Sequence, residues 1–210
     1  LMVQSLRRLR ESPSQTAGPY VHIGATPNFS GIGGVYPHDL GSQPLAPEVK
    51  GERIAVTGRI FDGSGTPIKD ALIEIWQADA QGLYPGQGER RGEADPHFPG
   101  WFRQPVDGTT GVYRFETVKP GIVPYFDGRP MAPHITVWIV ARGINIGLHT
   151  RLYFGDEEAA NAADPILARI EHRVRVPTLI ATRSEDEAGM PVYTFDIRLQ
   201  GEGETVFFDI

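Results

Sequence analysis

The chain has 210 residues, a formal net charge of −6 and no cysteine; 40% of its residues are hydrophobic and 22% are charged. This composition is typical of a globular protein with a sizeable core, and it excludes disulfides, thiolate metal sites and a cysteine nucleophile. No basic cluster is large enough to follow a phosphate backbone, so we expect no nucleic-acid partner. No apolar run approaches the roughly 20 residues that span a bilayer, and the first ten residues are too basic for a signal-peptide core, so the sequence predicts a cytoplasmic protein that does not enter a membrane.

The first 50 residues are predicted to be an amino-terminal arm and a surface loop that form an interface with another chain. Leu6–Glu11 is predicted to form one or two helical turns that end before Pro13, because the residue before a proline disfavours the α conformation. Residues 13–24 contain small residues and two prolines, which predict a fixed, extended arm that a ligand or another backbone approaches closely. The simpler alternative is a lead-in strand that only covers a sheet edge.

From residue 51 to residue 210 the sequence predicts an all-β fold, a β-sandwich with long loops and one short helical segment. Glycines and prolines, 25 and 18 in number, separate short runs rich in β-branched and aromatic residues. The turn at 62–65 is predicted to join the first two strands as a hairpin, a long loop is expected at 85–108, and the helical segment is expected to start at Asp156, with a second piece at Asp164. The predicted strands cover residues 53–61, 72–78, 112–117, 132–143, 148–154, 178–183, 192–199 and 205–208.

The run from Ala132 to Gly143 is the predicted central strand. Its side chains alternate at period two, so Ile135, Val137 and Ile139 share one face, which is plain core. The opposite face begins with a histidine, continues through a hydroxyl and an indole, and ends in a cation. Because such a row is unusual on an apolar strand, we expect function on this face. Its residues are His134, Thr136, Trp138, Val140 and Arg142.

These residues alone do not make a metal site. Two histidines two positions apart on a strand lie roughly 6.6 Å apart along the backbone, close enough to bind one metal. Here the second position is Thr136, whose hydroxyl is a poor ligand for a transition metal in competition with water. His134 is therefore predicted, from these residues alone, to be a hydrogen-bonded core histidine.

Two further pairs of residues carry weaker expectations. Trp76 and Trp138 are predicted to be core residues rather than a stacking platform. Arg151 and His149 lie on the same face of their strand, and we expect them to neighbour the strand that carries Arg142 or to pack at an interface.

Three blocks of the sequence occur in the order and spacing of the intradiol ring-cleavage dioxygenases: Glu74–Tyr84, Lys119–Gly121 and Ala132–Ile135. The chain resembles this family from about Arg53 to its carboxyl end. Within the family it is most similar to the alpha-type, non-catalytic subunit of the two-subunit enzymes. The segments that carry this closer resemblance are 13–24, 141–151 and 200–208.

The resemblance implies a β-sandwich that takes part in an oxidoreductase reaction of the β-ketoadipate pathway. In this reaction O₂ opens protocatechuate, 3,4-dihydroxybenzoate, between its two hydroxyls to give 3-carboxy-cis,cis-muconate. Catalytic members of the family hold a non-haem ferric ion, Fe(III), with two tyrosines and two histidines. These four ligand positions correspond here to Tyr84, Val123, His134 and Thr136, and the family's catalytic arginine corresponds to Met131.

Two of the four ligands and the arginine are therefore absent from this chain. The resemblance implies that the chain binds no iron by itself and is inactive alone. The Fe(III) is expected in a partner beta subunit of homologous fold, within a higher-order αβ oligomer. The residues expected to line the substrate pocket over the partner's iron are Thr16, Gly18, Pro19, Tyr20 and Arg142.

Strand geometry gives Arg142 some independent support. It lies eight residues beyond His134, about 26 Å along an extended strand, which is too far for its side chain to serve the degenerate site. A guanidinium at a strand end is well placed to bind a carboxylate with two parallel hydrogen bonds. The simpler alternative is a surface arginine in a solvent-exposed ion pair.

Two other functions remain open on the sequence. One is a β-sandwich carrier or scaffold that has no catalytic partner; it should purify as a well-behaved oligomer of one chain, whereas an obligate subunit should expose an apolar interface and aggregate. The other is an iron enzyme that uses ligands different from those aligned above, and it should show the colour of a tyrosinate–iron complex in the isolated chain.

Overall fold

The strands follow the alternating apolar runs of the sequence. The computed structural model describes residues 16–145 and 147–209, so the helical turns predicted at Leu6–Glu11 lie outside the described residues. The strands are β1 (Arg53–Phe61), β2 (Leu72–Trp76), β3 (Trp101–Pro105), β4 (Val112–Val118), β5 (Val123–Pro124), β6 (Pro130–Met131), β7 (His134–Val140), β8 (Leu148–Phe154), β9 (Ile180–Glu185), β10 (Pro191–Thr194) and β11 (Ile197–Arg198). The helices are α1 (Val21–Ala25) and α2 (Glu158–Ala163), and the 3-10 helices are η1 (Leu167–Arg169) and η2 (Arg173–Leu179).

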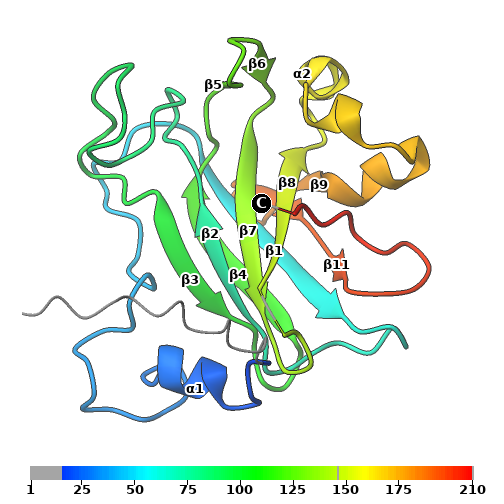
Figure 1. Cartoon of the computed structure of the whole chain (residues 1–210). Coiled ribbons are helices and arrows are strands. Elements are labelled where there is room, and N and C mark those ends of the chain that lie inside the picture. Colours follow the sequence, from blue (N-terminus) through cyan, green and yellow to red (C-terminus); the bar gives the residue numbers. More distant parts are fainter. Residues whose placement is uncertain (1–15, 146, 210) are drawn as a thin grey trace, which may run out of the picture.

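Nine strands form one sheet that folds into two layers. The first layer contains β9, β10, β1 and β4 in this order, and β11 also pairs with β1. The second layer contains β8, β7, β2 and β3 in this order. The two layers are continuous through a short parallel pairing of β8 with β9, and β1 crosses behind β7 (Figure 1). Apolar side chains of both layers meet in a single core that includes Ile54, Val56, Ile75, Ile135 and Leu152. The all-β sandwich predicted from the sequence is therefore confirmed.

The hairpin predicted around residues 62–65 is wrong. The tight turn does form, because Asp62 accepts hydrogen bonds from the backbone of Ser64 and Thr66 and Phe61 bridges Pro67. Pairing with β1 after the turn ends at Pro67, and the chain then crosses to the other layer, where β2 pairs with β3 and β7. β1 pairs with β4 instead. The local turn signal was correct, but it does not choose the partner of a strand that is buried on one face.

Other element boundaries also differ from the prediction. The loop expected at 85–108 contains strand β3, which the sequence analysis missed because Arg103, Gln104 and Pro105 interrupt its apolar pattern. The strand expected at 192–199 is divided into β10 and β11, and residues 205–208 form only an isolated bridge between Phe208 and His149. At this division the backbone of Phe195 comes so close to Gly58 of β1 that a Cβ atom there would lie 2.0 Å from the carbonyl oxygen of Phe195, so the position requires glycine.

The central strand and its partner are as predicted. β7 and β8 form an antiparallel hairpin, and Ile135, Val137 and Ile139 are buried in the core. On the opposite face of β7, His134 is buried, and Thr136, Trp138 and Val140 are half-buried.

A helical layer covers this second face near the start of β7. It runs from α2 through η1 and η2 and packs Leu167 and Leu179 against Tyr153 of β8 and Ala132 before β7. In Figure 1 the helical segments lie beside β8 and β6, and the carboxyl-terminal segment passes in front of β9. None of the helices in the described part of the chain is long and apolar enough to cross a membrane.

Candidate functional site

The amino-terminal arm and Arg142, which are far apart in sequence, meet at one end of β7. Ala17 forms a parallel bridge with Arg142, and its N–H donates to the carbonyl oxygen of Ile144 at 3.3 Å. The N–H of Gly143 donates to the hydroxyl of Thr16 at 2.9 Å. Gly143 has a φ of +84°, a conformation that favours glycine, so the chain turns here and presents its backbone to the arm.

The arm residues are open to solvent on their outer side. Gly18, Pro19 and Tyr20 are exposed, and no atom lies within 4 Å of the place that a Cβ atom of Gly18 would occupy. The structure thus brings together the five residues singled out as substrate-pocket residues: Thr16, Gly18, Pro19, Tyr20 and Arg142. Their role in binding substrate stays a prediction.

Arg142 is held by an ion pair but remains largely accessible. Its Nε lies 2.8 Å from Oδ2 of Asp70 in an ion pair, while 65% of the arginine side chain is exposed and Asp70 is buried. The ion pair considered as the simpler alternative therefore exists. Because most of the guanidinium side chain is open to solvent, it remains available to a carboxylate.

The opposite end of β7 carries the degenerate ligand set. Val123 of β5 pairs with Met131 of β6, and both side chains are buried, at 7% and 8% exposure. They pack with Ala78 and contact the rings of Tyr84 and Tyr125. Where catalytic relatives are expected to place a tyrosine and an arginine, this chain has a small apolar cluster.

The two ligand residues that are present, His134 and Tyr84, are both neutral at pH 7. Nδ1 of His134 lies 2.8 Å from the carbonyl oxygen of Ala132, and burial lowers the pKa of His134 to about 4, with the charge of Arg151 acting in the same direction. Burial raises the pKa of Tyr84, so its phenol is protonated at neutral pH. His134 is the hydrogen-bonded core histidine that its own sequence context predicts.

A cation that the sequence did not assign to this site lies beside these residues. Arg151 of β8 stands directly across the hairpin from Thr136 of β7, and its Nη1 donates to the sulfur of Met131 at 3.6 Å. Its charge is close enough to lower the pKa of both Tyr84 and His134. The expectation that Arg151 lies next to the strand of Arg142 is correct, but only the hairpin register places it opposite Thr136, far from Arg142.

The residues at this place do not fit a ferric ion. Val123 offers no donor atom, Met131 offers only a soft thioether, and the guanidinium of Arg151 is a fixed positive charge that repels a metal cation. Among the described residues, no group of three or more His, Cys, Asp or Glu side chains is arranged to hold a metal. The chemistry of the donor set therefore argues against metal binding by this chain.

The tryptophans differ from the prediction. Trp76 is 41% exposed at the end of β2, and its ring stacks on Tyr84 with 5.8 Å between centroids. Trp138 is half-buried and stacks on His149 at 6.0 Å. Both were expected in the core. They lie on outward faces of their strands, a location that hydrophobicity alone does not reveal.

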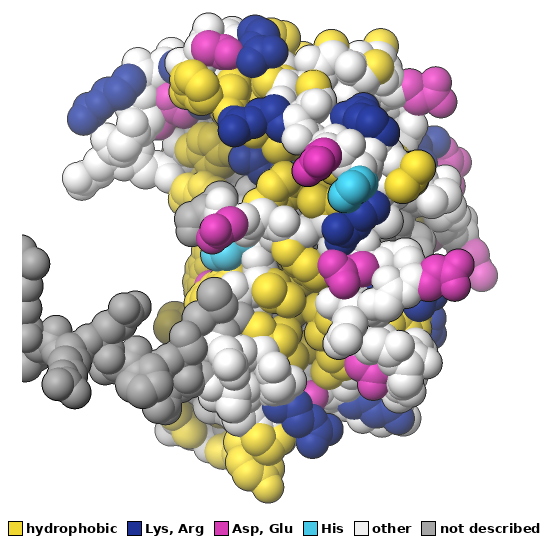
Figure 2. Space-filling view, turned by 45° about the vertical axis from the view of Figure 1, so that its right-hand side comes forward, with side chains coloured by type: hydrophobic (Ala, Val, Ile, Leu, Met, Phe, Trp, Pro, Cys, Tyr) yellow, Lys and Arg dark blue, Asp and Glu magenta, His cyan; other side chains and the backbone are white. Residues whose placement is uncertain are grey.

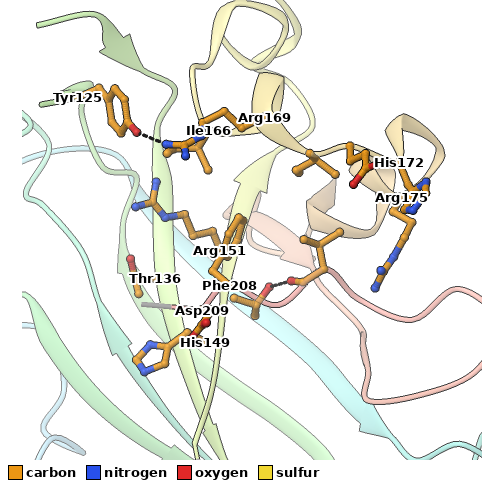
Figure 3. A pocket seen from close by; sticks show the side chains of 14 residues that line it. Tyr125, Thr136, His149, Arg151, Ile166, Arg169, His172, Arg175, Phe208 and Asp209 are labelled. Carbon is orange, nitrogen blue, oxygen red and sulfur yellow. Dashed lines mark hydrogen bonds between the residues drawn. The ribbon is translucent and has the colours of Figure 1, made fainter. Parts of the chain in front are cut away.

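A cavity of about 660 Å³ opens next to the degenerate ligand set, between β8, the helical layer and the carboxyl-terminal segment. Its lining includes Thr136, Arg151, Tyr125, Arg169, His149 and Phe208 (Figure 3). In the space-filling view, a strip of apolar side chains on this side of the molecule is bordered by Lys, Arg and His side chains with Asp and Glu side chains among them (Figure 2). No local sequence pattern indicates this cavity, because its walls come from segments that are distant in the chain.

Comparisons with known proteins give consistent results. A dioxygenase family model matches residues 25–201. The protocatechuate 3,4-dioxygenase alpha chain of Pseudomonas putida is 46% identical over 201 residues, which cover 96% of this chain and 97% of that protein. The alpha chain from Burkholderia cepacia is 41% identical, over 96% of this chain and 98% of that protein. The beta chain from Burkholderia cepacia is 34% identical, over 80% and 73%.

Solved structures show the same fold. The 3-chlorocatechol 1,2-dioxygenase of Rhodococcus opacus superposes with a TM-score of 0.56 at 19% identity, over 75% of this chain and 63% of that chain. The dioxygenase domain of a carbohydrate-binding fusion protein from a Streptomyces species superposes with a TM-score of 0.54 at 24% identity, over 80% and 94%.

Proposed function

This chain belongs to the intradiol dioxygenase family, and on that premise we propose that it is the alpha subunit of a protocatechuate 3,4-dioxygenase. The assembled enzyme cleaves 3,4-dihydroxybenzoate with O₂ between the two hydroxyls and forms 3-carboxy-cis,cis-muconate. The observation that carries the proposal is an intact family fold whose ligand set has become apolar at Val123 and Met131. Such a chain needs a partner for its chemistry, and the similarity to alpha and beta chains supports a beta-type partner.

The division of labour between the two subunits follows from the residues. Intradiol dioxygenases are iron-dependent, and we assign the Fe(III) to the beta subunit, where it supplies the activation of the catechol and its reaction with O₂. In this chain, the exposed guanidinium of Arg142 attracts the substrate's carboxylate, and Asp70 holds it in place. Thr16, Gly18, Pro19 and Tyr20 form a wall of the pocket and exclude water from it.

The amino-terminal region is suited to cover a partner, in an αβ oligomer. We propose that residues 1–50 form the interface and that 51–210 form the β-sandwich domain. Between residues 20 and 40, six large apolar side chains are exposed, which supports burial against another chain rather than a free carrier or scaffold. These residues are Tyr20, Phe29, Ile32, Val35, Tyr36 and Leu40. A cytoplasmic location stays a prediction from the sequence.

The test is to express this chain alone and together with a candidate iron-binding beta subunit. We expect the isolated chain to contain no stoichiometric iron, to be colourless and to aggregate. The co-expressed pair should purify as one coloured, active complex. Stoichiometric iron and activity in the isolated chain would overturn the division of labour. A stable, monodisperse preparation of this chain that does not bind the beta subunit would favour the scaffold function.

A further inference from the structure

The cavity beside the degenerate ligand set has the size of a small-molecule site. Its volume of about 660 Å³ lies within the roughly 300–1,000 Å³ that is usual for ligand pockets. All of its described walls belong to this chain, from β7 and β8 to the helical layer and the carboxyl-terminal segment. It is at the opposite end of β7 from Arg142, so it is separate from the pocket assigned above.

Two arginines of the cavity have no carboxylate partner among the described residues. Arg151 donates to the sulfur of Met131 at 3.6 Å and also interacts with the hydroxyl of Tyr153, and Arg169 donates to the hydroxyl of Tyr125 at 2.6 Å. Both guanidinium groups point to the side of the cavity where Tyr125 lies (Figure 3). Arg175, by contrast, is neutralised by Glu204 at 2.9 Å. Arg151 is half-buried and Arg169 is exposed, and a guanidinium that no carboxylate neutralises favours the binding of an anion, most strongly where it is partly buried.

The acidic residues of the lining do not neutralise these two cations. Glu171 and Asp209 line the cavity, but both are exposed, and neither forms an ion pair with Arg151 or Arg169 within the described part of the chain. A further polar group lacks a partner: Nδ1 of His149 is buried and has no hydrogen bond to any described residue. The cavity therefore offers a ligand two cations that no carboxylate of the described residues neutralises.

The remaining wall is apolar and partly aromatic. Phe208 lies under Arg151, with 6.0 Å from the guanidinium carbon to the ring, and Ile166, Ile170 and Val206 complete this side. An anion such as inorganic phosphate would bind to the arginines but leave the apolar wall exposed to water. A ligand with a flat apolar body and one carboxylate uses both parts of the cavity.

We propose that this cavity is a second binding site, for a small aromatic carboxylate, which this chain binds without converting it. Arg151 and Arg169 bind the carboxylate, and the ring lies against Phe208 and the aliphatic side chains. Because the neighbouring residues do not fit a metal, the site retains recognition of an anionic ring and has no ring-cleaving chemistry. It lies in this chain alone, so the proposal does not depend on the role assigned to Arg142.

The experiment measures the binding of labelled benzoate to the co-purified complex by equilibrium dialysis. Arg151→Gln removes one cation from the cavity; Arg169→Gln does so at an exposed position, where the fold is not at risk. The matched control is Arg114→Gln, an exposed arginine of β4 outside the cavity. Benzamide has the same shape as benzoate without its charge, and inorganic phosphate has the charge without the ring.

We expect the wild-type complex and the Arg114→Gln complex to bind one equivalent of benzoate per copy of this chain. The Arg151→Gln complex should lack this equivalent. Arg169→Gln should raise the dissociation constant for this benzoate by about tenfold. Benzamide and phosphate should compete for it at least about tenfold more weakly than unlabelled benzoate. Equal benzoate binding by the wild type and Arg151→Gln, or equal competition by benzamide, would overturn the proposal. A complex in which only Arg142→Gln reduces benzoate binding would do the same.

Discussion

The two ends of strand β7 differ in exposure and charge, although they belong to the same seven-residue element. At its start, Val123, Met131 and His134 are buried, apolar or neutral, and shielded by the helical layer. Just beyond its end, Arg142 is exposed and held by a single carboxylate, next to the open arm. The buried end has lost the donors that a metal requires, whereas the exposed end keeps a cation suited to an anionic substrate. The contrast indicates that the residues at the start of β7 serve to pack the fold, whereas the residues just beyond its end are available for binding.

The buried end depends most on Asp164. This fully buried carboxylate accepts hydrogen bonds at 2.8 Å from the N–H groups of Ala132, Ile166 and Leu167, and so joins the start of β7 to the helical layer. Asp164→Ala leaves these donors without a partner and should destabilise the complex by about 3 kcal/mol. Denaturant unfolding measures the loss. Asp164→Asn, which keeps one acceptor, should lose less, and an equal loss would contradict the account.

The buried end should also respond to pH through His134. The unfolded chain protonates this imidazole near pH 6.5, but the folded chain does so only near pH 4 because the ring is buried. Its contribution to stability is therefore complete above about pH 6.5 and falls by about 3 kcal/mol as the pH drops towards 4.

The measurement for His134 is the free energy of unfolding at pH 7 and at pH 4.5 for the wild type and for His134→Phe. The phenyl ring retains the packing against Tyr153, whose ring lies 5.7 Å away, and removes the titrating group. The variant should lose less stability than the wild type over this interval. Parallel losses would show that the imidazole does not titrate as its burial requires.

The exposed end should respond mainly in substrate binding. Arg142→Gln removes the charge from a side chain that is mostly in solvent, but it leaves the buried carboxylate of Asp70 without its ion-pair partner, so the free energy of unfolding should also fall, by about 1–3 kcal/mol. If the guanidinium binds the carboxylate of the substrate, KM for protocatechuate should rise about tenfold while kcat changes little. Steady-state kinetics of the assembled enzyme test this, with Arg114→Gln as the matched control. An unchanged KM would remove Arg142 from the pocket.

Asp70 should have the smallest effect. Its Oδ2 forms an ion pair with Nε of Arg142, while its Oδ1 has no hydrogen-bond partner among the described residues. Asp70→Asn keeps the shape and weakens the hold on the guanidinium, so KM should rise by about threefold or less. In the background of Arg142→Gln, Asp70→Asn should change KM no further. Additive effects in the double variant would mean that Asp70 acts independently of Arg142.

Much of the exposed end could be predicted from sequence, and less of the buried end. The resemblance pointed to the arm and Arg142 as one group, and the structure places them in contact, with their function still to be tested. It also identified Val123, Thr136 and Met131 as degenerate positions. It did not indicate that Arg151 lies among them or that a cavity opens beside them, because these features depend on the register between β7 and β8 and on a helical layer contributed by later residues.

The sequence by itself determined the properties that depend on residue identity and on neighbouring positions. These are the all-β class, the two faces of β7, and the absence of a tyrosine at Val123 and a histidine at Thr136. The tertiary structure decided which strands pair, so that β1 joins β4 and not β2, and which side chains share a cavity. The physical reason is that a side-chain period of two is a local property of a strand. Pairing and register between distant segments are set by the packing of the whole sheet.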